Sequence, residues 1–131
     1  MTTRRSKIVE KPAESFLPLT PAVFHILLAL ADEEAHGYAI MQEVAERSEG
    51  SVRLGPGTLY GAIGRLLAEG LIEEREERPD PEMDDARRRY YRLTHLGGSV
   101  LAAETKRLSD LVRAARSTKV IRKMRPEGGT L

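Results

Sequence analysis

The chain has 131 residues, of which 40% are hydrophobic and 31% charged, and its formal net charge is +1. This length suits one domain with a tail, and the composition is ordinary for a soluble helical protein. The absence of cysteine excludes disulfide and thiolate chemistry. No apolar run reaches the roughly 18 residues needed to cross a bilayer, and no apolar stretch of a signal peptide follows the basic N-terminus. We therefore expect a cytoplasmic protein with no membrane partner.

Positive charge gathers at the two ends of the chain. Residues 1–11 carry four cations against the single acid Glu10, and residues 113–125 carry six cations and no acid. Such ends suit a polyanionic partner, although solvated tails would have the same composition.

The first third of the chain predicts a flexible basic arm over residues 1–17 and then two helices. Thr20 can cap a helix, and Pro21 fits its first turn. The helix that follows, to about residue 31, is apolar nearly all round, which predicts burial on two sides, one of them facing a second subunit. After a polar break at 32–37, residues 38–47 have the apolar spacing of a second helix.

A third helix is predicted between Leu54 and Ile72, and it has two unlike faces. Its apolar face carries Leu59, Ile63, Leu66 and Leu67. The opposite face is almost bare and carries Gly57, Thr58, Gly61, Gly64, Arg65 and Ala68. Each glycine inside a helix costs about 1 kcal/mol relative to alanine. This face is therefore predicted to lie close to another molecule, and a DNA groove is a good candidate.

The last part of the chain predicts a hairpin and a long helix. A strand begins at residue 71, the loop over 79–86 is rich in proline and acids, and a second strand covers 87–93. Thr94 can cap a helix from about residue 95 to 124 whose apolar stripe has coiled-coil-like spacing. The residues predicted to form a dimer interface are Phe24, Leu28, Leu101, Leu108, Leu111, Val112 and Ala115.

The predicted fold is mostly α with a small β-hairpin. It comprises a winged helix-turn-helix DNA-binding domain over residues 18–94, a C-terminal dimerisation helix over 95–124 and a disordered tail over 125–131. A projecting helix with an apolar stripe is most simply buried in a two-fold dimer.

Five short motifs occur in order along residues 18–115. They are Leu19-Thr20-Pro21, His36-Gly37-Tyr38-Ala39-Ile40, Gly55-Pro56-Gly57-Thr58-Leu59-Tyr60, Glu69-Gly70-Leu71-Ile72 and Arg89-Tyr90-Tyr91-Arg92-Leu93-Thr94. Together they resemble the PadR family of bacterial transcriptional regulators, in the small class with a single C-terminal dimerisation helix. The resemblance implies a homodimeric repressor on a near-palindromic operator, with the third helix in the major groove and the wing beside it. It also implies release by a small-molecule effector.

The candidate DNA-binding residues are Tyr38, Thr58, Tyr60, Gly61, Gly64, Arg65, Arg87, Arg88 and Arg89. Thr58 is expected to hold a phosphate or to cap the helix. Arg65 either reaches a guanine edge or a phosphate, or pairs with Glu69 one turn away. The two tyrosines contact DNA or serve in packing. The family often has a basic residue where this chain has Gly64, so DNA shape is expected to contribute to specificity.

The predicted wing carries charges of both signs. Arg87, Arg88 and Arg89 enter its second strand, whereas acids crowd its tip at Asp80, Glu82, Asp84 and Asp85. The acids would repel phosphate and are expected to pair with the arginines when DNA is absent. The DNA contact is therefore placed at the base of the wing.

The remaining motifs predict no cofactor, no metal site and no enzyme. The three histidines lack metal-ligand spacing, and no nucleophile elbow or phosphate-binding loop occurs. The alternative to a regulator is a winged-helix protein-interaction module without DNA binding, which the bare helix face and the acidic wing tip favour. An effector would be small and apolar or aromatic and would lie near Phe24, Leu28 and the last helix. The low aromatic content of 5% argues against an aromatic sandwich.

Overall fold

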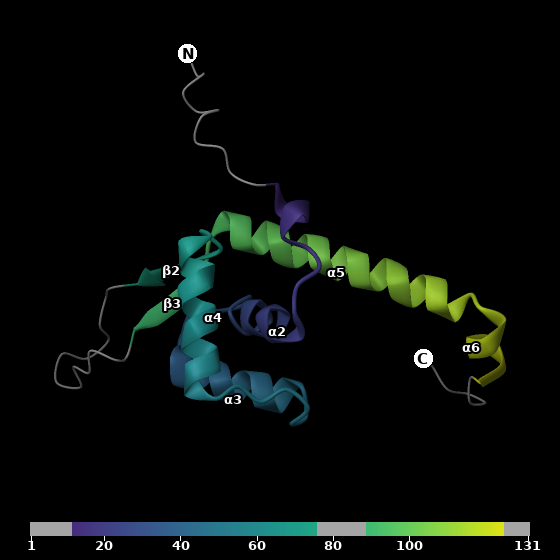
Figure 1. Ribbon diagram of the computed structural model, residues 1–131, viewed down its shortest axis with the longest axis horizontal. Helices are drawn as coiled ribbons and strands as arrows, with labels where there is room; N and C mark the ends of the chain where they lie inside the picture. Colours follow the sequence, from purple (N-terminus) through teal and green to yellow (C-terminus); the bar gives the residue numbers. More distant parts are fainter. Residues whose placement is uncertain (1–11, 76–88, 125–131) are drawn as a thin grey trace, which may run out of the picture.

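The computed structural model describes residues 12–75 and 89–124. Its helical elements are η1 (Ala13–Phe16, a 3-10 helix), α2 (Pro21–Ala29), α3 (Gly37–Arg47), α4 (Pro56–Ala68), α5 (His95–Arg116) and α6 (Lys119–Met124). Its strands are β1 (Ala35–His36), β2 (Ile72–Arg75) and β3 (Tyr90–Leu93). Figure 1 shows α2, α3 and α4 gathered beside the small sheet, with α5 extending beyond them. This arrangement confirms the predicted mostly helical, winged fold.

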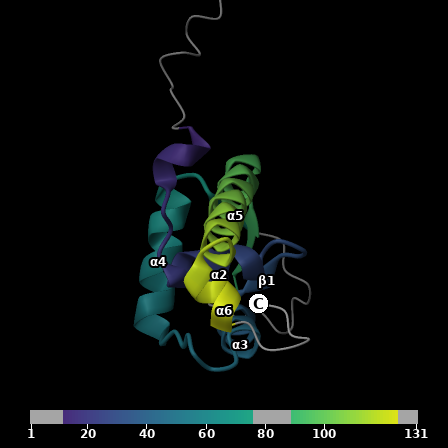
Figure 2. The same ribbon diagram turned by 90° about the vertical axis from the view of Figure 1, so that its right-hand side faces the viewer.

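The core lies where α2 meets the other helices. Ile26 and Leu27 of α2 are fully buried, and α2 contacts both α3 and α5. The predicted cap is confirmed, because the Thr20 hydroxyl accepts a hydrogen bond from the Val23 N–H at 3.2 Å. Figure 2, turned by 90°, shows α5 passing across α2. The buried residues of α2 are therefore covered by other helices of the same chain.

The sheet has three antiparallel strands in the order β1-β3-β2. The predicted hairpin is present, with Ile72 opposite Leu93 and Arg75 opposite Tyr90. The third strand, β1, was predicted only as part of a polar break, and it pairs Ala35 with Tyr91. A two-residue strand is too short to show alternation, so its formation depends on the partner strand.

The predicted single helix to residue 124 is wrong in one respect, because α5 ends at Arg116 and α6 begins at Lys119. The Ser117 and Thr118 hydroxyls donate to the carbonyls of Ala114 and Ala115, each at 2.8 Å. Thr118 also accepts from the Ile121 N–H at 3.2 Å. Serine and threonine compete in this way with helical hydrogen bonding, which explains the break.

The described part of the predicted flexible arm differs from the prediction, while residues 1–11 of the arm lie outside the described residues. Residues 13–16 form η1, which contacts α5, and Phe16 and Leu17 pack against the core. Figure 1 shows η1 beside α5. The folded part of the described chain thus includes residues that composition alone assigned to the arm. Within the described ranges, no helix is long and apolar enough to cross a membrane.

Candidate nucleic-acid interface

Helix α4 has the two unlike faces predicted from its sequence. Leu59, Ala62, Ile63 and Leu66 are buried, and the residues of the bare face are exposed: Gly57, Thr58, Gly61, Gly64, Arg65 and Ala68. A Cβ atom added at Gly57, Gly61 or Gly64 would meet no atom within 4 Å. The packing of this chain therefore gives no reason for glycine at these three positions.

Tyr60 lies across the start of α3. A Cβ atom at Gly37, the first residue of α3, would lie 2.2 Å from the Tyr60 hydroxyl oxygen. The Tyr60 side chain is thus held in place by packing, yet the residue remains 43% exposed. Both expectations for Tyr60, a packing role and an accessible position, fit this geometry. The need for glycine at position 37 was not predicted, because it arises from a contact between two helices.

The start of α3 is fixed by a histidine cap. The His36 Nδ1 accepts from the Ala39 N–H at 3.3 Å, and the His36 and Tyr90 rings pack in a T-shaped arrangement at a centroid distance of 5.4 Å. Tyr38 follows and is 60% exposed, and its hydroxyl accepts from Gln42 Nε2 at 3.4 Å. The core-packing alternative for Tyr38 is therefore wrong.

The side chains of Thr58 and Arg65 have no hydrogen-bond or ion-pair partner in the described part of the chain. Gly55 is the N-cap of α4, and no side chain caps this helix, so the capping alternative for Thr58 is wrong. The predicted pair between Arg65 and Glu69 does not form either, since neither residue has a salt bridge within the described ranges. Both polar groups on the bare face are free to meet a ligand.

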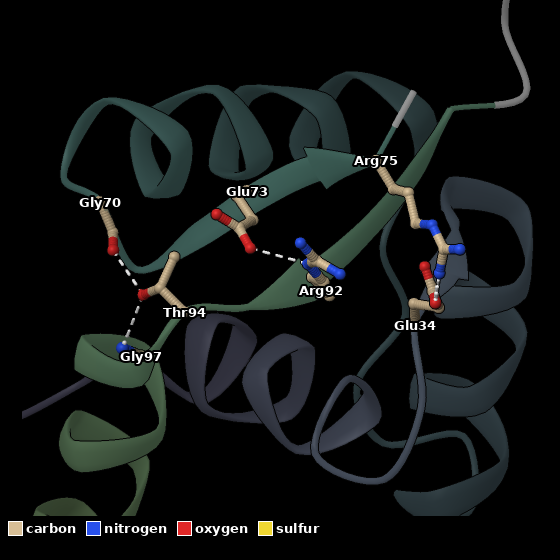
Figure 3. Close-up of polar contacts among 7 residues, drawn as sticks. All are labelled: Glu34, Gly70, Glu73, Arg75, Arg92, Thr94 and Gly97. Carbon is tan, nitrogen blue, oxygen red and sulfur yellow. Dashed lines mark hydrogen bonds and ion pairs between the residues drawn. The ribbon is translucent and has the colours of Figure 1, made fainter. Parts of the chain in front are cut away.

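The base of the wing is tied to α4 and α5 by Thr94 (Figure 3). The Thr94 hydroxyl donates to the Gly70 carbonyl at 2.6 Å and accepts from the Gly97 N–H at 3.0 Å. One side chain thereby joins the end of α4 to the first turn of α5, which confirms the predicted cap. This junction fixes the sheet relative to the bare face of α4.

Arginines at the base of the wing are engaged by acids. Arg92 pairs with Glu73 at 2.7 Å and Arg89 pairs with Glu74 at 2.9 Å. Arg75 pairs with Glu34, in the turn that precedes α3 (Figure 3). These partners come from strand β2 and this turn. The pairing of the wing-tip acids with Arg87, Arg88 and Arg89 stays a prediction. Arg87, Arg88 and the acidic tip at residues 80–85 lie outside the described residues.

Six cations of the described chain form no ion pair. They are Arg53, Arg65, Arg116, Lys119, Arg122 and Lys123. Arg53 precedes α4 and Arg65 belongs to it. The other four lie at the end of α5 and in α6. Uncompensated positive charge is thus confined to two parts of the described surface.

A buried carboxylate joins the N-terminal segment to α5. Glu104 is 1% exposed and accepts from the Leu19 N–H at 3.1 Å. Arg107 donates two hydrogen bonds to it, from Nε at 2.6 Å and from Nη2 at 2.8 Å. These hydrogen bonds from Arg107, aided by the one from Leu19, hold the pKa of Glu104 below its ordinary value although burial opposes them. No sequence signal marks this role, because Leu19 is 85 residues away.

The apolar stripe of α5 divides into two parts. Val100 is fully buried, and Leu96 and Leu101 pack against the core of the same chain. Farther along, Leu111 and Val112 are 53% and 49% exposed. Leu108, Phe24 and Leu28 are partly exposed, and Ala115 is exposed. The part of the α5 stripe that a partner can contact therefore begins near Leu108. Leu101, which was predicted to lie in the dimer interface, also packs against the core of its own chain.

Large apolar side chains are exposed in two regions of the described surface. Tyr38 and Tyr60 form the first, and the second consists of Leu111, Val112, Val120 and Met124. Among the described residues, no group of three or more histidine, aspartate or glutamate side chains is placed to hold a metal ion.

Comparisons with known proteins identify the family. The Transcriptional regulator PadR-like family matches residues 26–103. The Transcriptional regulator Rv3488 of Mycobacterium tuberculosis (strain ATCC 25618 / H37Rv) is 37% identical over 89 residues, an alignment that covers 68% of this chain and 77% of the relative.

Solved structures agree with this match. A PadR family transcription regulator from Clostridium difficile R20291 aligns with a TM-score of 0.61 and 27% identity, covering 72% of this chain and 94% of that one. A transcriptional regulator from Clostridium thermocellum aligns with a TM-score of 0.61 over 75% of this chain and 89% of its own, at 21% identity, which supports the fold. The chain belongs to the PadR-like family of transcriptional regulators, which are not enzymes.

Proposed function

We propose that the protein is a homodimeric repressor that binds a near-palindromic operator with α4 in the major groove. The observation that carries this proposal is the exposed face of α4, whose glycines the fold does not require. A helix fits the major groove, and bare positions allow its backbone to approach the bases and phosphates closely. The domain boundaries of the proposal are residues 18–94 for DNA binding and 95–124 for dimerisation, in a cytoplasmic protein.

The candidate DNA-binding side chains would make different contacts with the duplex. Thr58, in the first turn of α4, would hold a phosphate together with the free N–H groups of the helix start. Arg65 would reach a guanine edge or a phosphate. Tyr38 and Tyr60 would present hydroxyl groups to the backbone, and Arg87, Arg88 and Arg89 would contact DNA beside the operator groove.

Arg65 offers the direct test of the proposed groove contact. Arg65→Ala is expected to weaken binding to the operator by about 1–3 kcal/mol, because alanine cannot form a bidentate pair with a base edge. The operator is first obtained by selecting random duplex DNA with the wild-type protein, and the affinity is then measured by gel shift. Arg47→Ala is the matched control, since Arg47 lies on α3 and is already paired with Glu43. Equal affinity of the two variants would contradict the assignment of α4. Selection that enriches no motif would favour the interaction-module alternative.

Glycine substitutions separate folding from binding on the same helix. Gly61→Ala and Gly64→Ala are each expected to raise the free energy of unfolding by about 0.5–1 kcal/mol, because alanine favours the helix. Both are expected to weaken operator binding, because the new methyl groups occupy the surface that meets DNA. Urea unfolding and gel shift measure the two effects. Gly98→Ala on α5 is the control: its Cβ also has free space, and it should leave DNA affinity unchanged. Wild-type affinity in both α4 variants would count against close approach.

Dimerisation is proposed through the exposed end of α5. Leu111→Glu is expected to convert the dimer to a monomer, because a carboxylate would then be buried without a partner. Sedimentation velocity reads out the oligomeric state. Lys106→Glu is the control, since the Lys106 side chain is 78% exposed on another face of α5. A dimer that persists in Leu111→Glu would place the interface elsewhere.

An effector that releases DNA would bind near Phe24, Leu28 and α5, where the first two side chains are partly exposed. The proposal names a small apolar or aromatic acid. Thermal-shift screening of the dimer with such acids would test it, and a Phe24→Ala variant that still responds to the same acid would exclude this location.

A further inference from the structure

The C-terminal cationic segment, defined here as residues 113–124, is a positively charged surface beyond the family match. It carries no acid, and the match ends at residue 103. Its cations are Arg113, Arg116, Lys119, Arg122 and Lys123, all exposed. The segment is therefore a feature of this chain that the winged fold does not account for.

Four of these cations have no compensating acid within the described ranges. Arg113 pairs with Asp110 at 3.0 Å, whereas the other four form no ion pair with any described residue. By contrast, Arg47, Arg92 and Lys106 each pair with an acid on the folded domain. An uncompensated run of cations produces a local positive potential that attracts polyanions.

The segment lies at a distance from α4. Figure 1 shows α6 at the end of α5 that is remote from α4. Both views place α6 on the side of α5 where α2 and α3 lie. Helix α5 has 22 residues, which corresponds to a length of about 33 Å, close to one turn of B-DNA at about 34 Å. A DNA contact made by this segment would thus fall on phosphates outside the groove that α4 occupies.

We propose that the C-terminal cationic segment is a second DNA contact, one that binds the phosphate backbone flanking the operator. This inference rests on the proposed function, since it assumes that α4 positions the DNA. Phosphate contacts carry no sequence information, so the segment contributes affinity and salt dependence without contributing specificity. An anionic lipid surface is less well matched, because α6 has only six residues and contains no Trp, Phe or Leu.

The test compares two double variants that remove equal charge. Arg122→Gln/Lys123→Gln alters the segment, and Arg47→Gln/Lys106→Gln removes two cations that are already paired. Fluorescence anisotropy with labelled duplexes over a range of salt gives affinity and the salt slope. The segment variant is expected to bind about tenfold more weakly at low salt, and its slope should fall by about 0.9 for each phosphate that it no longer neutralises. The weakening should be equal for the selected operator and for a scrambled duplex. The control should match the wild type.

Trimming the duplex supplies a second measurement. When the flanks of the operator are removed, the wild type should weaken to the level of the segment variant, and the segment variant should change little. A segment variant that matches the control in affinity, slope and response to trimming would overturn the inference while leaving the function of α4 intact. A different result would contradict the proposed function alone. In that case the wild type would show no preference for a DNA motif, while its salt slope would still exceed that of the segment variant. Stronger wild-type binding to phosphatidylglycerol vesicles than to DNA would assign the surface to lipid and overturn the proposal.

Discussion

Replacing Gly97 with alanine is expected to lower the free energy of unfolding by about 3 kcal/mol, at the upper end of the usual cost of overpacking. The added Cβ atom would lie 2.0 Å from the carbonyl oxygen of Leu71. This obstacle is backbone, so it cannot rotate away as a flexible side chain would. Urea unfolding followed by circular dichroism measures the effect.

The cost is large because Leu71 and Gly97 meet at the junction of three elements. The Thr94 N–H donates to the Leu71 carbonyl at 3.0 Å, and the Thr94 hydroxyl joins Gly70 to Gly97. A shift that relieves the clash would disturb this connection between α4, the sheet and α5. Gly98→Ala is the matched control and should stabilise the protein by up to about 1 kcal/mol. If the two alanine variants were equally stable, the close approach of Gly97 to Leu71 would be disproved.

Glu104→Ala is expected to destabilise the protein by about 3 kcal/mol, near the lower end of the range for breaking a buried ion pair. The substitution leaves the Leu19 N–H without its acceptor, and an unsatisfied buried donor is costly. Arg107 keeps some access to water, since its side chain is 36% exposed, which limits the destabilisation. Asp110→Ala is the control from the same helix. Asp110 holds only surface ion pairs, with Lys106 and Arg113, so its removal should leave stability close to wild type.

The same carboxylate predicts a pH dependence with a defined sign. The folded protein lowers the pKa of Glu104, chiefly through the Arg107 hydrogen bonds, below the ordinary value of 4.5 expected for the unfolded chain. The unfolded chain therefore binds more protons in acid, and stability falls as pH decreases. The contribution should be complete above pH 4.5 and should disappear as the pH falls through the lowered folded pKa. Wild-type urea unfolding between neutral and acidic pH should show a steeper fall than Glu104→Ala. Parallel curves would contradict the assignment.

Local signals predicted the main helices, the hairpin and the two faces of α4. Thr20 and Thr94 each cap a helix by bonding to an N–H three residues ahead, a contact within one turn that composition can show. The division of α4 into a buried and a bare face follows from its periodicity in the same way. The break between α5 and α6 also has a local cause, the hydrogen bonds from the Ser117 and Thr118 hydroxyls to backbone carbonyls. The pattern of apolar residues does not reveal whether these hydroxyls bond to the backbone.

Contacts between distant parts of the chain decided the rest. Strand β1 exists because β3 lies beside it, and Gly37 is required because Tyr60 crosses the start of α3. The pairing of Arg89 with Glu74 and of Arg92 with Glu73 follows from the register of the hairpin.

By itself, the sequence determined the family, the helix order and the exposed face of α4, because these depend on spacing within one or two turns. Only the tertiary structure decided which part of the α5 stripe the domain already buries, which cations remain unpaired and how Glu104 holds Leu19. The physical reason is that burial and ion pairing depend on where the chain returns in space. A repeating pattern along the chain predicts that a face is apolar, but it does not predict what covers that face.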